Sequence, residues 1–187
     1  MGHIRSLNRV TLIAALLASV TLVTITSRTE GAFANTIARC QETQLDVKIT
    51  SDGAAAGHVG DLIVISNVGA SACTVTGYAR VSMSGGANVV STVAKKTKNG
   101  YLGGLGGTGT TMSIPAVTLR AHGGAASSIV EGGDVPVGNA VECVTYTKVS
   151  VALPLLNPPY RFTTKFPGCI RPEVHPFVRG SKGLPYK

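Results

Sequence analysis

Few residues of this chain have the types and spacing that chemistry requires, and the first candidate is a glycine-rich run at positions 104–109. The run reads GLGGTG and fits the G-x-G-x-x-G pattern of loops that hold the phosphates of a dinucleotide. That chemistry needs a strand before the loop and a helix after it, whose N-terminus faces the phosphate. Here a lysine-rich stretch precedes the run and a β-like stretch follows it. We therefore interpret the run as a mobile hairpin loop and expect no cofactor.

A second candidate lies beside this run and consists of Lys95, Lys96, Lys98 and Tyr101. Lysines neutralise phosphate charge and an aromatic ring can stack on a base, so this set is a candidate interaction surface for an anionic polymer. The alternative is a solvated, charged loop without a ligand. Nothing in the set points to specific recognition of a nucleic acid.

Candidate catalytic and metal-binding residues are dispersed along the sequence. His58, His122 and His175 lie far apart, in turns or near the C-terminus, and we interpret them as turn residues rather than zinc ligands. A hydrolase needs a nucleophile, a base and an orienting acid. No serine lies in a G-x-S-x-G motif, and no pair of carboxylates lies close to a histidine. We expect no catalytic residues, with an extracellular hydrolase of unrecognised type as the alternative.

Four cysteines are present: Cys40, Cys73, Cys143 and Cys169. An even number in an exported chain indicates disulfides rather than metal or redox chemistry. The sequence midpoint between Cys40 and Cys73 falls in the connection between the predicted strands 45–49 and 62–65. The midpoint between Cys143 and Cys169 falls in the connection between the predicted strands 144–153 and 160–166. In an antiparallel hairpin, the two cysteines of each pair would therefore meet at the end opposite the turn. We predict the bonds Cys40–Cys73 and Cys143–Cys169. The rival is an immunoglobulin-like Cys73–Cys143 bond, which the lack of tryptophan disfavours.

Short strands joined by turns must position these residues. Residues 45–49 alternate apolar and polar side chains, and residues 62–65 form an apolar run that returns after a connection. Glycine is abundant, with 23 residues, and no convincing helix follows the first thirty positions. We predict an all-β domain over residues 35–171, an immunoglobulin-like two-sheet antiparallel β-sandwich. Residues 172–187 are basic, contain proline and glycine, and are expected to be a poorly ordered tail.

The N-terminus has the layout of a secretory signal peptide. Arg5 and Arg9 precede an apolar run at 10–25, and the small-x-small sequence at 32–34 offers a cleavage site. The alternative is a membrane anchor, although the run is short for a span of about 20 residues. We expect a signal-peptide helix over residues 1–34, removed after Ala34. The remaining chain would carry a net charge of +6.

One stretch also carries a family resemblance. A cysteine at position 40, a DGAAAGH turn at 52–58, an SNVG turn at 66–69 and a CTVTGY return at 73–78 make up the pattern. It resembles an exported actinobacterial family known only as domain of unknown function 4232, over roughly residues 40–169. The resemblance implies an immunoglobulin-type sandwich in secreted or lipid-anchored proteins, and no catalytic residues. The arginine before Cys40 does not fit a lipidation site.

These features favour a secreted or envelope-associated, non-catalytic binding module. The loops 66–72, 95–109 and 131–140 are candidate contact surfaces, because recognition commonly uses loops on a rigid sandwich. We expect the partner to be an envelope or extracellular protein or an anionic polymer. Membrane contact is expected only through the signal peptide before its cleavage. A purely structural envelope component is a further alternative.

Overall fold

The computed structural model of the protein describes residues 36–87, 89–106 and 112–184. These residues form one short 3₁₀ helix and twelve strands, with no α-helix among them. The elements are η1 (Glu42–Gln44), β1 (Leu45–Ala55), β2 (His58–Asn67), β3 (Cys73–Thr76), β4 (Arg80–Ser84), β5 (Thr92–Val93), β6 (Lys95–Lys96), β7 (Ala116–Leu119), β8 (Ala125–Gly133), β9 (Thr145–Ala152), β10 (Tyr160–Pro167), β11 (Ile170–Val174) and β12 (Val178–Arg179). The predicted signal-peptide helix lies outside the described residues.

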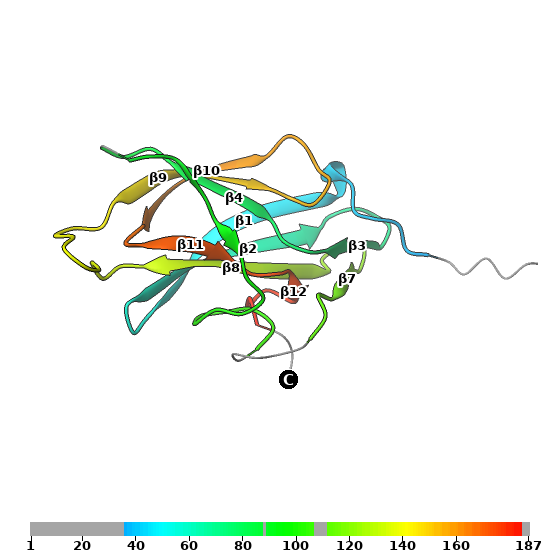
Figure 1. Ribbon diagram of the computed structural model, residues 1–187. Coiled ribbons are helices and arrows are strands. Elements are labelled where there is room, and N and C mark those ends of the chain that lie inside the picture. The colour runs from blue at the N-terminus through cyan, green and yellow to red at the C-terminus, as the bar shows by residue number, and fades with distance from the viewer. Residues whose placement is uncertain (1–35, 88, 107–111, 185–187) are drawn as a thin grey trace, which may run out of the picture. The chain divides into compact units, whose positions relative to one another are not determined.

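Two larger sheets form the two layers of the domain, and a two-stranded ribbon lies beside them (Figure 1). The first sheet has the order β1-β2-β8-β11-β6, with β12 also paired to β8. The second has the order β10-β9-β4-β5, and β3 pairs with β7 in the ribbon. Every strand pairing is antiparallel except that of β6 with β11. The expected all-β, immunoglobulin-like sandwich is confirmed, and the ribbon and the parallel pair are features that we did not predict.

The main core lies between the two larger sheets. Ile63 and Ile65 of β2 face it from one side, and Val81 and Met83 of β4 face it from the other. In each strand the two residues are two positions apart, as a strand with one buried face requires. Phe166 of β10 joins the same cluster and is 1% exposed.

Strand β8 is buried on both of its faces, unlike a strand at the surface of a sandwich. All of its residues after Ala125 are buried. Ala126 and Val130 belong to the main core, whereas Ile129 points to the opposite face. There the loop after β6 and the segment after β12 cover it, because Gly103 and Gly183 both lie against the Ile129 side chain. The outer face of this sheet therefore carries a second, smaller layer of chain.

Both disulfides have the predicted pairing. Cys40 is bonded to Cys73 and Cys143 to Cys169, and none of the described cysteines is free. The β1–β2 hairpin pairs Leu45 with Asn67 at its open end, so the first bond lies just beyond that end. The rival Cys73–Cys143 bond is excluded.

The expected disorder after residue 171 is wrong for the described residues 172–184. Residues 170–174 form β11, and Phe177 is fully buried in the main core. Val178 and Arg179 pair with β8 as β12. The prolines that suggested a loose tail lie in or between these short strands, and the segment remains packed on the domain. The described part of the chain contains no helix with the length and apolar character that a membrane span requires.

Candidate functional site

One buried carboxylate holds the loop that follows β6. Glu131 lies on β8 and is 5% exposed. Its Oε1 accepts a hydrogen bond from the backbone N–H of Tyr101 at 3.0 Å, and its Oε2 accepts one from that of Leu102 at 2.8 Å. His175 Nε2 lies 3.3 Å from Glu131 Oε2, and His58 Nδ1 lies 3.9 Å from Oε1. We call these five residues the Glu131 cluster.

Burial by itself would raise the pKa of the Glu131 carboxyl, because a charge loses its hydration in the interior. The contact with His175 and the two backbone N–H donors act in the opposite direction and outweigh burial. Together they lower the pKa of Glu131 to about 2. The carboxylate is therefore ionised at neutral pH and acts as a fixed anionic anchor for the loop.

His175 is enclosed by protein on every side and is 0% exposed. Its Nδ1 lies 3.2 Å from Thr97 Oγ1 and 3.3 Å from the Thr97 carbonyl oxygen. Ser128 Oγ donates a hydrogen bond of 2.6 Å to the backbone carbonyl of His175. The Nε2 atom of His175 lies 3.3 Å from Glu131 Oε2, without the geometry of an aligned hydrogen bond. The imidazole thus joins the loop to the C-terminal segment.

Glycines let the loop approach this pair closely. A Cβ on Gly100 would overlap both the His175 ring and the Glu131 carboxyl carbon, and a Cβ on Gly103 would lie 2.8 Å from Ile129 Cδ1. The Gly100 N–H donates to the Gly103 carbonyl at 2.9 Å, which closes a tight turn over the cluster. The glycine density that predicted a mobile loop instead permits close packing.

The cluster resembles a hydrolase in one respect only. A hydroxyl, an imidazole and a carboxylate follow one another in the order Thr97, His175, Glu131, as in a catalytic triad. None of the described pockets is lined by any of the three, and the Gly100 backbone lies directly on the imidazole. The arrangement holds the loop, and the Gly100 backbone covers the imidazole on the side that faces the loop.

The structure brings together residues that we expected to be dispersed. His58 and His175 both face Glu131, so the expectation of isolated turn histidines is wrong for these two. A single carboxylate, that of Glu131, faces both rings, which is not the pair of carboxylates that we looked for in the sequence. Glu131 belongs to β8 and not to a contact loop, because the exposed part of that predicted loop begins at Asp134.

The predicted lysine surface is partly occupied by contacts within the protein. Lys95 forms an ion pair of 3.3 Å with Glu173 across the parallel β6–β11 pair. Lys96 lies over the ring of Tyr78 at 5.9 Å from its centroid. The Tyr101 ring stacks on His58 with 4.6 Å between centroids.

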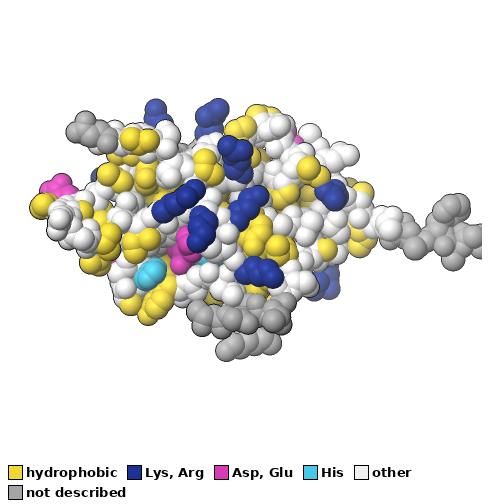
Figure 2. All heavy atoms as spheres, viewed as in Figure 1, with side chains coloured by type: hydrophobic (Ala, Val, Ile, Leu, Met, Phe, Trp, Pro, Cys, Tyr) yellow, Lys and Arg dark blue, Asp and Glu magenta, His cyan; other side chains and the backbone are white. Residues whose placement is uncertain are grey.

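Lys98 is exposed and has no ion pair with another described residue. Lys and Arg side chains spread widely over the face shown in Figure 2, with few acidic side chains between them.

The described part of the glycine-rich pattern does not have the setting of a dinucleotide loop. Gly104 adopts a φ of +105°, and its position would not accept a Cβ because the Lys98 carbonyl fills the space. Leu105 N–H donates to that same carbonyl at 2.9 Å. Of the next described residues, 116–119 form strand β7 instead of a helix. Positions 107–109 lie outside the described residues.

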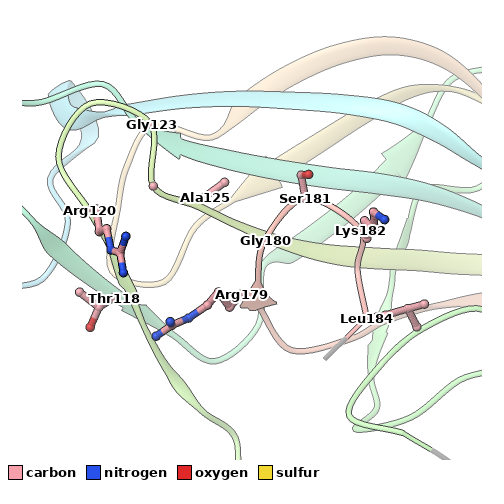
Figure 3. Close-up of a pocket in the computed structure, with 10 residues that line it drawn as sticks. Thr118, Arg120, Gly123, Ala125, Arg179, Gly180, Ser181, Lys182 and Leu184 are labelled. Carbon is pink, nitrogen blue, oxygen red and sulfur yellow. The ribbon is translucent and has the colours of Figure 1, made fainter. Parts of the chain in front are cut away.

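A cationic pocket lies between the end of β7, the start of β8 and the segment after β12 (Figure 3). Its volume is about 580 Å³. It is lined by Thr118, Arg120, Gly123, Gly124, Ala125, Arg179, Gly180, Ser181, Lys182 and Leu184. The Gly180 N–H donates to the Ala125 carbonyl at 3.0 Å, which fixes the C-terminal segment against β8. We call this site the cationic pocket.

Three positive charges line this pocket without an acidic counterpart. Arg120 comes from β7's end, Arg179 from β12 and Lys182 from the segment that follows, and all three are exposed. None of the three side chains forms an ion pair or a hydrogen bond with another residue that the structure describes. Figure 3 shows the guanidinium groups of Arg120 and Arg179 reaching into the same space. Such a concave, positive site attracts anions.

Sequence reasoning missed this pocket because two of its cations lie in the segment interpreted as a tail. The excess of basic residues after position 148 was visible, but its convergence with Arg120 depends on β12 pairing with β8. His122, beside Arg120, keeps its predicted place in a turn, with a φ of +55°.

A second buried carboxylate lacks any partner. Asp61 of β2 is 5% exposed, and its Oδ2 has no hydrogen bond within the described structure. Burial raises the pKa of this carboxyl to about 6. Within the described residues, no group of three His, Cys, Asp or Glu side chains has an arrangement that could hold a metal ion.

The fold and the two bonds define a disulfide-bonded, all-β sandwich domain. The chain belongs to the family described as Domain of unknown function (DUF4232), whose sequence model matches residues 40–176. The resemblance that we predicted from the cysteine and turn pattern is thereby confirmed. No curated protein and no solved structure matches the chain.

Proposed function

We propose that this protein is a non-catalytic binding module that works outside the cytosol and holds an anionic group of its partner in the cationic pocket. The single observation that carries this proposal is the convergence of Arg120, Arg179 and Lys182 on one cavity without an acidic residue in its lining. Charges without a partner in the fold are available to one outside it, and guanidinium groups suit carboxylate and phosphate oxygens.

The two disulfides support the location. Such bonds persist in oxidising compartments and are rare in the cytosol. Four of four cysteines are bonded, which fits export followed by oxidation. The signal-peptide pattern at residues 1–34 is consistent with this compartment. The envelope or extracellular medium is therefore the proposed place of action.

The absence of catalysis is proposed from the use of the reactive side chains. The Glu131 carboxylate and the His175 imidazole both contact the loop after β6 and hold it in place, and His175 is fully buried. The described lining of the cationic pocket contains Thr118 and Ser181 but no His, Asp or Glu that could activate a hydroxyl. This lining favours binding over catalysis.

The test compares two double variants of equal charge change. Arg120→Gln with Arg179→Gln removes two cations from the pocket, whereas Lys148→Gln with Arg161→Gln removes two exposed cations from the β9–β10 hairpin. The probe is dextran sulfate, with neutral dextran of the same length as reference, and binding is followed by interferometry at several salt concentrations.

We expect the pocket variant to bind dextran sulfate at least ~10-fold more weakly than the native protein, because two charge-assisted contacts are lost. The hairpin variant should differ from the native protein by less than about threefold, since only long-range attraction changes. If both variants bound dextran sulfate equally more weakly, binding would depend on net charge alone, and the proposed site would be wrong.

A further inference from the structure

A second cavity of about 210 Å³ adjoins the cationic pocket and differs from it in character. Its lining is mostly apolar and consists of Leu105, Met112, Ser113, Pro115, Ala116, Val117, Val178 and Arg179. Among the described residues of this lining, Arg179 is the only charged one, and it also lines the cationic pocket. The two cavities thus share the residue Arg179.

Strand β7 joins the two cavities along its outer face. Side chains alternate between the faces of a strand, so Ala116, Thr118 and Arg120 lie on the same face. Ala116 lines the apolar cavity, and the other two line the cationic pocket. Leu119 is buried in the core, and Val117 is buried there while also lining the apolar cavity. We call the two adjoining cavities the β7 groove, which is apolar along the start of β7 and cationic beyond its end.

We propose that this groove binds a single-chain anionic amphiphile, such as a fatty-acyl carboxylate or an alkyl phosphate. The inference rests on the proposed function and names the class of ligand. Arg120, Arg179 and Lys182 hold the anionic head, and the alkyl chain lies along β7 towards Leu105 and Val178.

The charges and the lining select this class. A purely ionic ligand would leave the apolar cavity unused, and a neutral lipid would leave the three cations unpaired. The residues that the structure describes in the apolar lining include no aromatic ring on which a base or sugar could stack. It also offers few polar groups to pair with the backbone of a peptide. The two cavities are together within the usual size of a small-molecule site, about 300–1,000 Å³.

The experiment titrates three probes into the oxidised protein recovered from its native location, using calorimetry. The probes are decyl phosphate below its micelle concentration, inorganic phosphate, and decyl maltoside as the neutral chain of equal length. We expect decyl phosphate to bind at least ~10-fold more tightly than either of the others, because only this probe satisfies both cavities. Lengthening the chain from octyl to decyl should raise affinity by about two- to fourfold per added CH₂.

Two variants separate the two ends of the groove. Arg179→Gln should weaken decyl phosphate and inorganic phosphate alike, by about tenfold. Ala116→Gln places a polar amide at an exposed strand position in the apolar cavity and should abolish the dependence on chain length, while inorganic phosphate stays within about twofold. Arg161→Gln, far from the groove in sequence and sheet, should leave all three affinities unchanged.

Three results would overturn the inference. One is decyl phosphate binding no more tightly than inorganic phosphate, and another is decyl maltoside binding as tightly as decyl phosphate. The third is binding to vesicles of phosphatidylcholine and phosphatidylglycerol without binding of monomeric decyl phosphate, which would indicate a membrane surface as partner. In each case the dextran sulfate comparison stands on its own, so the binding module could survive while this ligand class is rejected.

Discussion

The Glu131 cluster and the cationic pocket both include a residue of β8 but use charge in opposite ways. In the cluster, one carboxylate receives two backbone N–H groups and faces two histidines. In the pocket, three cations share one cavity and have no partner among the described residues. The first region is buried under a loop, whereas the second opens to solvent between β7 and β12.

This difference separates charges that serve the fold from charges that remain available. A buried charge is tolerated when hydrogen bonds and an opposite charge compensate for lost hydration. An exposed group of like charges has no such compensation and repels itself modestly. The fold therefore depends on the cluster, and any partner would act on the pocket. Four measurements test this difference between the two regions.

The largest effect is expected from Glu131→Gln. The change removes the charge that accepts the Tyr101 and Leu102 N–H groups, and it should lower the free energy of unfolding by about 3–5 kcal/mol. Urea denaturation at neutral pH measures the loss. Glu173→Gln is the control, because its pair with Lys95 is exposed and worth less than about 1 kcal/mol. If both variants lost the same free energy of unfolding, the Glu131 cluster would contribute no more to stability than an exposed ion pair.

The next effect is a stability profile with two opposing limbs in acid. In the unfolded protein the Glu131 carboxyl is protonated as the pH falls below its pKa of 4.5, whereas in the native protein it stays ionised down to about pH 2. The free energy of unfolding therefore falls as the pH falls from 4.5 to about 2. Asp61 acts with the opposite sign, because its native pKa of about 6 lies above the ordinary aspartate value of 3.8. Its native form binds the extra proton between those values, so stability falls as the pH rises through them.

Each limb should amount to about 3 kcal/mol at most. Urea titrations at a series of pH values measure the profile for the native protein and two variants. Asp61→Asn should remove the loss of stability between 3.8 and about 6, and Glu131→Gln should remove the loss between 4.5 and about 2. A profile that neither substitution changes would show that other groups control acid stability.

A smaller effect is expected from Gly100→Ala. The added methyl group would overlap His175 and Glu131, so the loop must shift at a cost of about 1–3 kcal/mol. Hydrogen exchange should show faster exchange of the Tyr101 and Leu102 N–H groups, which Glu131 accepts. Gly106→Ala serves as the control, because its φ of +107° makes it strained but its Cβ meets nothing. Unchanged protection in Gly100→Ala would show that the loop does not depend on this close approach.

The smallest effect on stability is expected from removing cations of the pocket. Arg120→Gln with Arg179→Gln should change the free energy of unfolding by less than about 0.5 kcal/mol, because neither side chain has a partner to lose. Thermal and urea unfolding measure this alongside the binding assays. If the free energy of unfolding fell by more than about 1 kcal/mol, these arginines would contribute to the stability of the fold, and the two regions would not differ in the way described.

The sequence was sufficient for the elements whose signals are local. Alternation at residues 45–49 and the apolar run at 62–65 identified the β1–β2 hairpin, and the positions of Cys40 and Cys73 around it gave the first bond. The same reasoning gave Cys143–Cys169. Both succeed because a hairpin pairs residues symmetrically about its turn, and the sequence shows that turn directly.

The Glu131 cluster and the cationic pocket could not be predicted because they join distant segments. His58, Tyr101, Glu131 and His175 meet only through the pairing of β2 with β8 and the return of the chain after β11. Proline and glycine after residue 171 suggested disorder, but burial of Phe177 and His175 outweighs those local preferences. In the loop after β6, the glycines gave the same misleading signal, because dense glycine accompanies close packing as readily as mobility.

The parallel pair of β6 with β11 has a consequence for the order in which the domain can be completed. The pair brings Lys95 next to Glu173, and the neighbouring loop rests on His175, close to the end of the chain. Glu173 and His175 follow the start of this loop by more than seventy positions, so during synthesis the loop after β6 lacks its support until the chain has been made as far as His175.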